Sequence, residues 1–381
     1  MQIFDDIARG QQDPPQQNET AFAYLNRSGR GVAEHVRQLV VCWFDHYPAD
    51  KRGGLLARFR STIDDDHHSA FFELFLHEFI LVRGHKIVAI EPALEGTSKS
   101  PDFLAETTQG DRFYLEAVMT TGRSREEKAA QTRLNVALTA IDGTPSPRHF
   151  LDLYVHGVPG APITIRKMKA DLRKWIAALP DDRSAFDVGP FTFEEHGARI
   201  MLRAWPRQNQ EWAERAIGVR HFPAQQEKSY DDIRDALEKK AKRYGSLDHP
   251  YVVAVNAMRL FPREDGVIDA VLGTPNGIVR VFADGRQSFE DGRRPDGVWV
   301  GRRGPRNQGL SAVLSTEGID PWNFASHRAR VVRNPWAIKE FPRIAFGIDE
   351  FNPVDGIFQR TDGSQFGAVF GLPESWPEER G

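Results

Sequence analysis

The first third of the chain carries regular helical patterns of apolar residues. Apolar side chains at a 3.6-residue spacing predict a helix over residues 31–44, and a second helix is predicted over 52–60. The strongest stripe follows them and ends at Gly84, where a helix stop is expected. Its members are Phe72, Phe75, Leu76, Phe79 and Ile80.

Short strand patterns come next. Strands are predicted over residues 86–90, 102–106 and 112–119, followed by a helix over 125–141 and a strand over 150–155. The predicted order from residue 71 onward is therefore α-β-β-β-α-β. This order indicates an α/β fold, with a mixed sheet flanked by helices.

The remainder of the chain has a less regular pattern. A helix is predicted over 166–179, a hairpin over 191–205, and a helix over 230–244 that leads into a strand over 251–255. We therefore expect a helical extension (1–65), a core (66–158) and a C-terminal α+β region (159–381). The alternative is that the strand over 251–255 joins the first sheet and makes one extended domain.

Composition limits the classes of protein to consider. The 381 residues are 40% hydrophobic and 27% charged, which is typical of a globular protein, and the net charge of −3 still allows a local basic groove. The single cysteine excludes an internal disulfide and a multi-cysteine zinc site. Neither a membrane-length apolar run nor a signal-like N-terminus is present, so a cytoplasmic location is expected.

Three carboxylates occupy informative places in the predicted core. Glu73 lies beside the apolar stripe of the first core helix, Asp102 follows Pro101 at the start of a strand, and Glu116 lies inside the next strand. A carboxylate in an otherwise apolar strand is costly to bury unless it is paired or binds a cation. Asp102 and Glu116 on neighbouring strands can converge on one divalent ion, for which Mg²⁺ (or Mn²⁺) is the natural candidate.

These residues also resemble a family signature. The run 96–104 with Pro101-Asp102, followed by 113–118 with Glu116, is similar to the signature of PD-(D/E)XK, restriction-endonuclease-like nucleases. The resemblance covers residues 68–156 and implies a restriction-endonuclease-like core that hydrolyses phosphodiester bonds in DNA, with RNA as a second choice. It also implies that Asp102 and Glu116 bind the metal and that Glu73 assists them.

The sequence departs from the signature at the lysine two residues after the glutamate. Val118 occupies that position and can neither carry charge nor donate a hydrogen bond. Lys99 is the preferred substitute, because it lies on the loop that leads into Asp102, and Lys128 or Gln131 are alternatives. Two other hypotheses stay open: a catalytically inactive module that binds nucleic acid or a protein partner, and an unrelated protein whose carboxylates are structural.

Basic segments suggest where nucleic acid would bind. Arginines cluster among glycines at Arg293, Arg294, Arg302 and Arg303, and two predicted helices carry basic runs over 166–174 and 239–243. Such runs on helices are more often solvated faces than binding sites. The residues do not show the oligomeric state. The resemblance allows a homodimer, because nucleases that cut both strands often pair up, and a partner protein is the other assembly considered.

Overall fold

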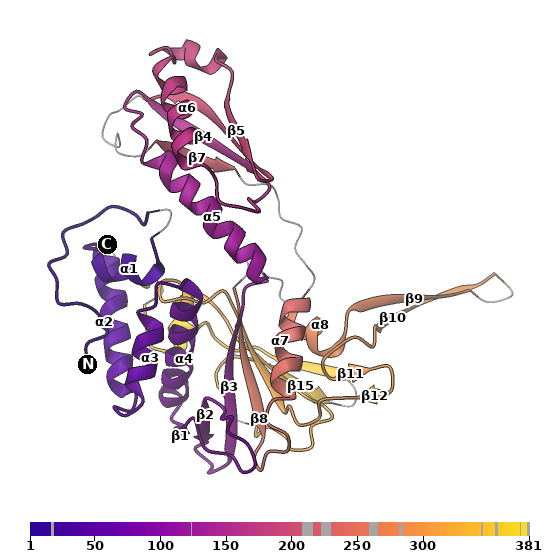
Figure 1. Cartoon of the computed structure of the whole chain (residues 1–381). Helices are drawn as coiled ribbons and strands as arrows, with labels where there is room; N and C mark the ends of the chain where they lie inside the picture. Colours follow the sequence, from indigo (N-terminus) through magenta and orange to yellow (C-terminus); the bar gives the residue numbers. More distant parts are fainter. Residues whose placement is uncertain are drawn as a thin grey trace. The chain divides into compact units, whose positions relative to one another are not determined.

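The computed structural model describes the whole chain except residues 17–18, 123, 208–215, 222–229, 259–265, 282–284, 344–345, 355–356, 374 and 379–381. Two compact units make up the chain (Figure 1). Unit 1 contains residues 1–13, 20–122 and 228–381, and unit 2 contains residues 14–19 and 123–227. Unit 2 is thus largely an insertion between two parts of unit 1.

Unit 1 is built on an eight-stranded mixed sheet in the order β1-β2-β3-β8-β13-β14-β15-β16. The strands β1 (Lys86–Ile90), β2 (Phe103–Glu106) and β3 (Arg112–Thr120) form an antiparallel meander. Next to it, β8 (Tyr251–Ala257) runs parallel to β3, and β13 (Ala312–Glu317) runs parallel to β8. The far edge consists of β14 (Arg330–Arg333), β15 (Asp349–Val354) and β16 (Ile357–Thr361).

Helices cover both faces of this sheet (Figure 1). One face packs against the N-terminal helices, which are α1 (Ala21–Arg27), α2 (Gly31–His46), α3 (Arg52–Phe59) and α4 (Asp64–Val82). The short elements η2 (Phe324–Ser326) and α9 (Phe366–Val369) join the same core. The other face packs against α7 (Asp231–Ala241) and α8 (Gly266–Leu272).

The strand β3 divides these two cores because its side chains alternate between the faces. Phe113 and Leu115 pack with α4, whereas Tyr114 and the partly buried Val118 pack with α7. Glu116 has the same parity as Tyr114 and Val118, so it faces the α7 side. Its carboxylate is therefore presented to a helix that lies more than a hundred residues further along the chain.

The strand predicted to close the first sheet belongs elsewhere. The observed β4 (His149–His156) pairs with β6 and β7 in unit 2, and β8 takes the place beside β3. The predicted boundary near 158–160 consequently falls inside unit 2. The strand over 251–255 joins the first sheet, as the open alternative predicted, but the chain forms two compact units and not one extended domain.

Unit 2 is a small α/β unit with a four-stranded sheet in the order β5-β6-β4-β7. Its strands are β5 (Phe191–Glu195), β6 (Ala198–Pro206), β4 and β7 (Ile217–His221). The helices α5 (Arg125–Asp142) and α6 (Ile165–Ala177) pack on this sheet through Leu134, Leu138 and Met168. A short 3-10 helix, η1 (Arg183–Asp187), precedes β5.

Two small ribbons complete unit 1. The strands β9 (Pro275–Val281) and β10 (Gln287–Arg293) form one antiparallel pair, and β11 (Val300–Gly301) and β12 (Gly304–Pro305) form a short hairpin. Among the described residues, no helix is both long enough and apolar enough to cross a membrane.

Candidate functional site

Asp102 and Glu116 meet at the start of β2. The β2–β3 register pairs Phe103 with Leu115, so Asp102 lies opposite Glu116 when the register is continued by one residue. The backbone N–H of Ala117 donates to Asp102 Oδ2 at 2.6 Å, which fixes the aspartate against β3. Glu116 itself is only 2% exposed. The structure thus brings the two predicted metal ligands together.

The electrostatics of this pair are unfavourable without a cation. Burial, the carboxylate of Glu116 and the carboxylate of Glu73 raise the pKa of Asp102 to about 7. Carboxylates crowded in a low-dielectric site cannot all ionise cheaply, and a proton or a metal ion relieves the repulsion. Asp102 therefore exchanges its proton near neutral pH.

Glu116 has two partners that the sequence reasoning did not assign. Lys240 Nζ from the last turn of α7 forms an ion pair with Glu116 Oε1. The hydroxyl of Tyr244, just after α7, lies 2.5 Å from Glu116 Oε2 and 2.8 Å from the carbonyl oxygen of Ser100. Burial and Glu116 together raise the pKa of Tyr244 well above its usual value, so this hydroxyl stays protonated and donates.

Glu73 is held by a separate pair of donors on the α4 side. Tyr47 Oη donates to Glu73 Oε1 at 2.7 Å, and Arg58 Nη2 lies 2.7 Å from Glu73 Oε2. Glu73 is 7% exposed, so its charge is compensated mainly by Arg58, whose side chain is 43% exposed. Because Glu73 contributes to the raised pKa of Asp102, it borders the same site.

Lys99 is not the cation that the structure places beside the carboxylates. Its side chain is exposed and makes no ion pair within the described part of the chain, and its backbone N–H donates to Thr97 Oγ1 at 3.1 Å. Lys128 and Gln131 lie on α5 in unit 2. Lys240 lies beside Glu116, where Lys99 was expected. The sequence signal that includes Lys240 is the basic run over 239–243, although such runs are more often solvated faces.

The four predicted arginines have different surroundings. Arg293 pairs with Asp269 at 2.7 Å and also donates to the carbonyl oxygen of Gly273, so it has a structural role. Arg294 is exposed beside it. Arg302 and Arg303 are exposed at the tip of the β11–β12 hairpin.

The arrangement of donors limits how a metal could bind. Among the described residues, no group of three or more histidine, cysteine, aspartate or glutamate side chains is arranged to hold a metal ion. Asp102 and Glu116 are the carboxylates that lie opposite each other; a metal bound by this pair would have to displace Lys240 from Glu116, just as one bound by Glu73 would have to displace Arg58. Mg²⁺ is commonly held by one or two carboxylates with water and substrate phosphate, so this pair is compatible with it.

Comparisons of the chain with protein-family models, with curated proteins and with solved structures found no match. What the site can do is therefore argued from its own geometry.

Proposed function

We propose that this protein is a metal-dependent nuclease that hydrolyses phosphodiester bonds of DNA. The observation that carries the proposal is the pairing of Asp102 with Glu116 on adjacent strands, with Lys240 on Glu116 and with the pKa of Asp102 raised to about 7. Two acidic ligands and a neighbouring lysine are the groups that metal-assisted phosphodiester hydrolysis needs.

The order of elements in unit 1 supports a core like that of the PD-(D/E)XK nucleases. Without unit 2, the order is α4, β1, β2, β3, α7 and β8, which is the α-β-β-β-α-β order expected from the resemblance. The difference is that the second helix and the fourth strand come after an insertion. In this proposal the lysine missing at Val118 is supplied by α7, the second helix of that order.

The residues have distinct roles in the proposed reaction. Asp102 and Glu116 would hold Mg²⁺ or Mn²⁺, and such an ion would neutralise the charge that builds on the phosphate in the transition state. Lys240 would shift from Glu116 toward the substrate phosphate and stabilise the same charge. Tyr244 keeps Glu116 oriented, and Glu73, held by Tyr47 and Arg58, adds negative charge near Asp102.

Cleavage of supercoiled plasmid and of single-stranded DNA, with Mg²⁺ or Mn²⁺ and with EDTA as the metal-free reference, tests the proposal. We expect metal-dependent nicking that falls by at least about 100-fold in Asp102→Ala and in Lys240→Ala, because each removes charge stabilisation at the phosphate. Lys99→Ala is the matched control and should retain wild-type activity. A single-stranded RNA of the same sequence should be cut more slowly than the DNA.

One result would overturn the proposal, and another would correct only the role of Lys240. Folded wild-type protein that cuts nothing with either metal would favour the inactive binding module. Wild-type activity of Lys240→Ala, equal to that of Lys99→Ala, would show that Lys240 takes no part in the reaction. The rest of the nuclease proposal would stand. Circular dichroism of each variant separates lost activity from lost folding.

A further inference from the structure

The exposed face of α7 carries cations that lead toward the carboxylate pair. Ile233 and Leu237 are buried against the sheet, whereas Lys239, Lys242 and Arg243 are exposed. Lys239 lies on α7 between Glu238 and Lys240, and Lys242 and Arg243 follow directly after the helix ends at Ala241. Because Lys240 contacts Glu116, these cations lie next in sequence to a residue of the proposed active site.

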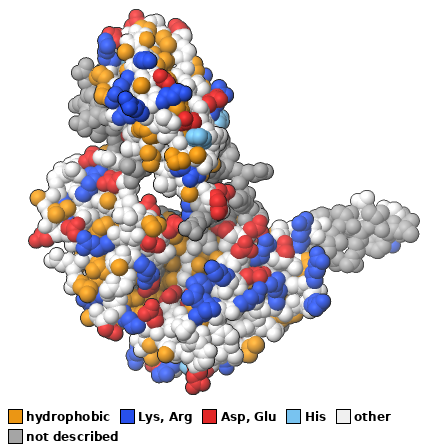
Figure 2. Space-filling view, in the orientation of Figure 1, with side chains coloured by type: hydrophobic (Ala, Val, Ile, Leu, Met, Phe, Trp, Pro, Cys, Tyr) orange, Lys and Arg blue, Asp and Glu red, His pale blue; other side chains and the backbone are white. Residues whose placement is uncertain are grey.

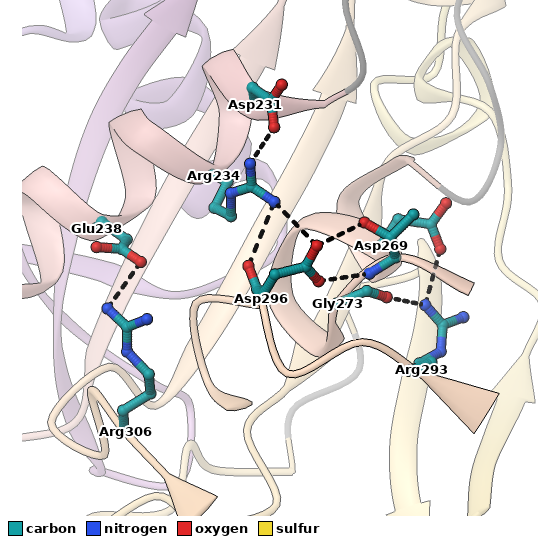
Figure 3. A network of polar contacts seen from close by, with 9 residues as sticks. Asp231, Arg234, Glu238, Asp269, Gly273, Arg293, Asp296 and Arg306 are labelled. Atoms are coloured by element: carbon teal, nitrogen blue, oxygen red, sulfur yellow. Dashed lines mark hydrogen bonds and ion pairs between the residues drawn. The ribbon is translucent and has the colours of Figure 1, made fainter. Parts of the chain in front are cut away.

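The β11–β12 hairpin is attached to α7 by an ion pair. Arg306, directly after β12, pairs with Glu238 at 2.8 Å (Figure 3). The backbone N–H of Arg306 also donates to the carbonyl oxygen of Trp299, a fully buried side chain that anchors the base of the hairpin. The exposed tip residues Arg302 and Arg303 are therefore presented from a fixed base next to the helix.

We call these cations, Lys239, Lys242, Arg243, Arg302 and Arg303, the α7–hairpin surface. Figure 2 shows Lys and Arg side chains gathered over the part of unit 1 that holds α7 and the hairpin. Within the described part of the chain, only Lys242 of this set has an ion-pair partner, Glu238 at 3.1 Å.

The neighbouring arginines are neutralised instead. Arg234 pairs with Asp231 and Asp296, and Arg293 pairs with Asp269 (Figure 3). Cations in the last turn of a helix are favoured by the helix dipole, which accounts for part of the charge on α7. The dipole does not account for two adjacent arginines at a hairpin tip. Uncompensated like charges of this kind, in a chain of net charge −3, indicate a polyanionic ligand.

We propose that the α7–hairpin surface binds the backbone of duplex DNA and leads it to the Asp102–Glu116 pair, with the tip of the β11–β12 hairpin in the major groove. The B-DNA major groove admits a two-stranded ribbon, whereas the major groove of A-form RNA is too deep and narrow to be read this way. The cations of α7 then contact phosphates on the strand that approaches Glu116. The choice of DNA as the ligand rests on the proposed function, but the binding can be measured without cleavage.

Fluorescence anisotropy of a labelled 20-base-pair duplex, in EDTA and over a range of NaCl concentrations, tests this inference. Two double variants, Arg302→Ala/Arg303→Ala and Lys239→Ala/Arg243→Ala, each remove two cations that would face the DNA. We expect each to weaken binding about tenfold at 150 mM salt and to lower the slope of log K against log salt by about 2. The matched control is Lys86→Ala/Arg112→Ala, which removes two exposed cations at the β1–β3 edge of unit 1 and should change neither value.

The possible outcomes separate the two proposals. Wild-type slopes in both surface variants, or an equal loss in the control, would overturn the α7–hairpin surface. An RNA duplex that binds as tightly as DNA and loses affinity equally in the hairpin variant would overturn the placement in the DNA groove. Selective loss of DNA binding in a protein that cuts nothing would support the surface and overturn the nuclease proposal instead.

Discussion

At the scale of single residues, the site combines a carboxylate with a raised pKa, Asp102, and a carboxylate that already has a cationic partner, Glu116. Glu116 is almost fully buried, and Lys240 and Tyr244 compensate its charge. Asp102 accepts one backbone N–H bond, and the carboxylates of Glu116 and Glu73 raise its pKa while the charge of Lys240 lowers it. A cation that enters the site would therefore be expected to bind Asp102 first and Glu116 second, as Lys240 moves away.

The raised pKa of Asp102 makes a prediction about stability. Between about pH 4 and pH 7 the folded chain keeps a proton on Asp102 that the unfolded chain has released, so this group lowers stability as the pH rises through that window. Asp102→Asn removes the titration and can still accept from Ala117. We expect the free energy of unfolding of Asp102→Asn, relative to wild type, to increase by about 2 kcal/mol between pH 5.5 and pH 8.

Urea unfolding at both pH values, without added metal, measures this difference, and the pH dependence of groups distant from Asp102 cancels in the comparison. Asp111→Asn, an exposed aspartate at the β2–β3 turn, is the control and should give no change. A constant offset between Asp102→Asn and wild type would show that Asp102 titrates normally.

At the scale of elements, α7 is the helix that positions the site, and α5 is not. Leu237 of α7 and Leu134 of α5 are both buried leucines, at 0% and 1% exposure, so Leu→Ala at either should cost about 2–4 kcal/mol. Only Leu237→Ala loosens the helix that carries Lys240. We expect Leu237→Ala to lower cleavage per folded molecule and to reduce amide protection in β3 and α7, and Leu134→Ala to do neither.

Cleavage assays corrected for the folded fraction, together with hydrogen exchange read by mass spectrometry, check this expectation. Reduced protection in β3 after Leu134→Ala would mean that α5 supports the sheet of unit 1. Equal cleavage by the two folded variants would show that the packing of α7 does not control the reaction.

The sequence predicted the elements well but not which of them share a sheet. Helices α2 to α5 and strands β1 to β4 lie where the periodicity placed them, because apolar spacing is a local property. The choice of fourth strand depends on pairing over more than a hundred residues. A signal was present: Tyr251 to Ala257 is buried at every position, as a central parallel strand should be, whereas β4 carries Asp152 between apolar residues.

The contact of Lys240 with Glu116 could not be predicted for the same reason. A motif lysine two residues after Glu116 would be placed by the local sequence. Lys240 reaches Glu116 only because α7 packs on the face of β3 that carries Glu116. The contacts of Glu73 with Tyr47 and Arg58 likewise depend on tertiary packing, including that of α3 against α4. Contacts of this kind follow from tertiary structure and not from spacing along the chain.

At the scale of the whole molecule, the insertion of unit 2 separates two halves of one sheet. The strand β3 ends at Thr120, whose carbonyl accepts the N–H of Met258 just after β8, so both sides of the insertion are fixed to unit 1. Gly122 lies close to Asp232 of α7: a Cβ placed on Gly122 would be 3.6 Å from the Asp232 carboxylate. The points where the chain leaves and re-enters unit 1 are thus near each other.

A short linker should therefore replace unit 2 without unfolding unit 1. We expect a variant in which residues 123–227 are replaced by about six Gly and Ser residues to fold, because unit 1 has its own two hydrophobic cores, and to unfold cooperatively. It should keep the pH-dependent stability set by Asp102 and, if the site is a nuclease, metal-dependent cleavage of short duplexes. Calorimetry and the plasmid assay measure both, with the same linker inserted after Gly110 in the full chain as the control for linker effects.

An unfolded deletion variant beside a folded control would mean that unit 2 stabilises the sheet. A folded variant that has lost only its activity would mean that unit 2 contributes to substrate binding, which would shift attention to the basic helix α6.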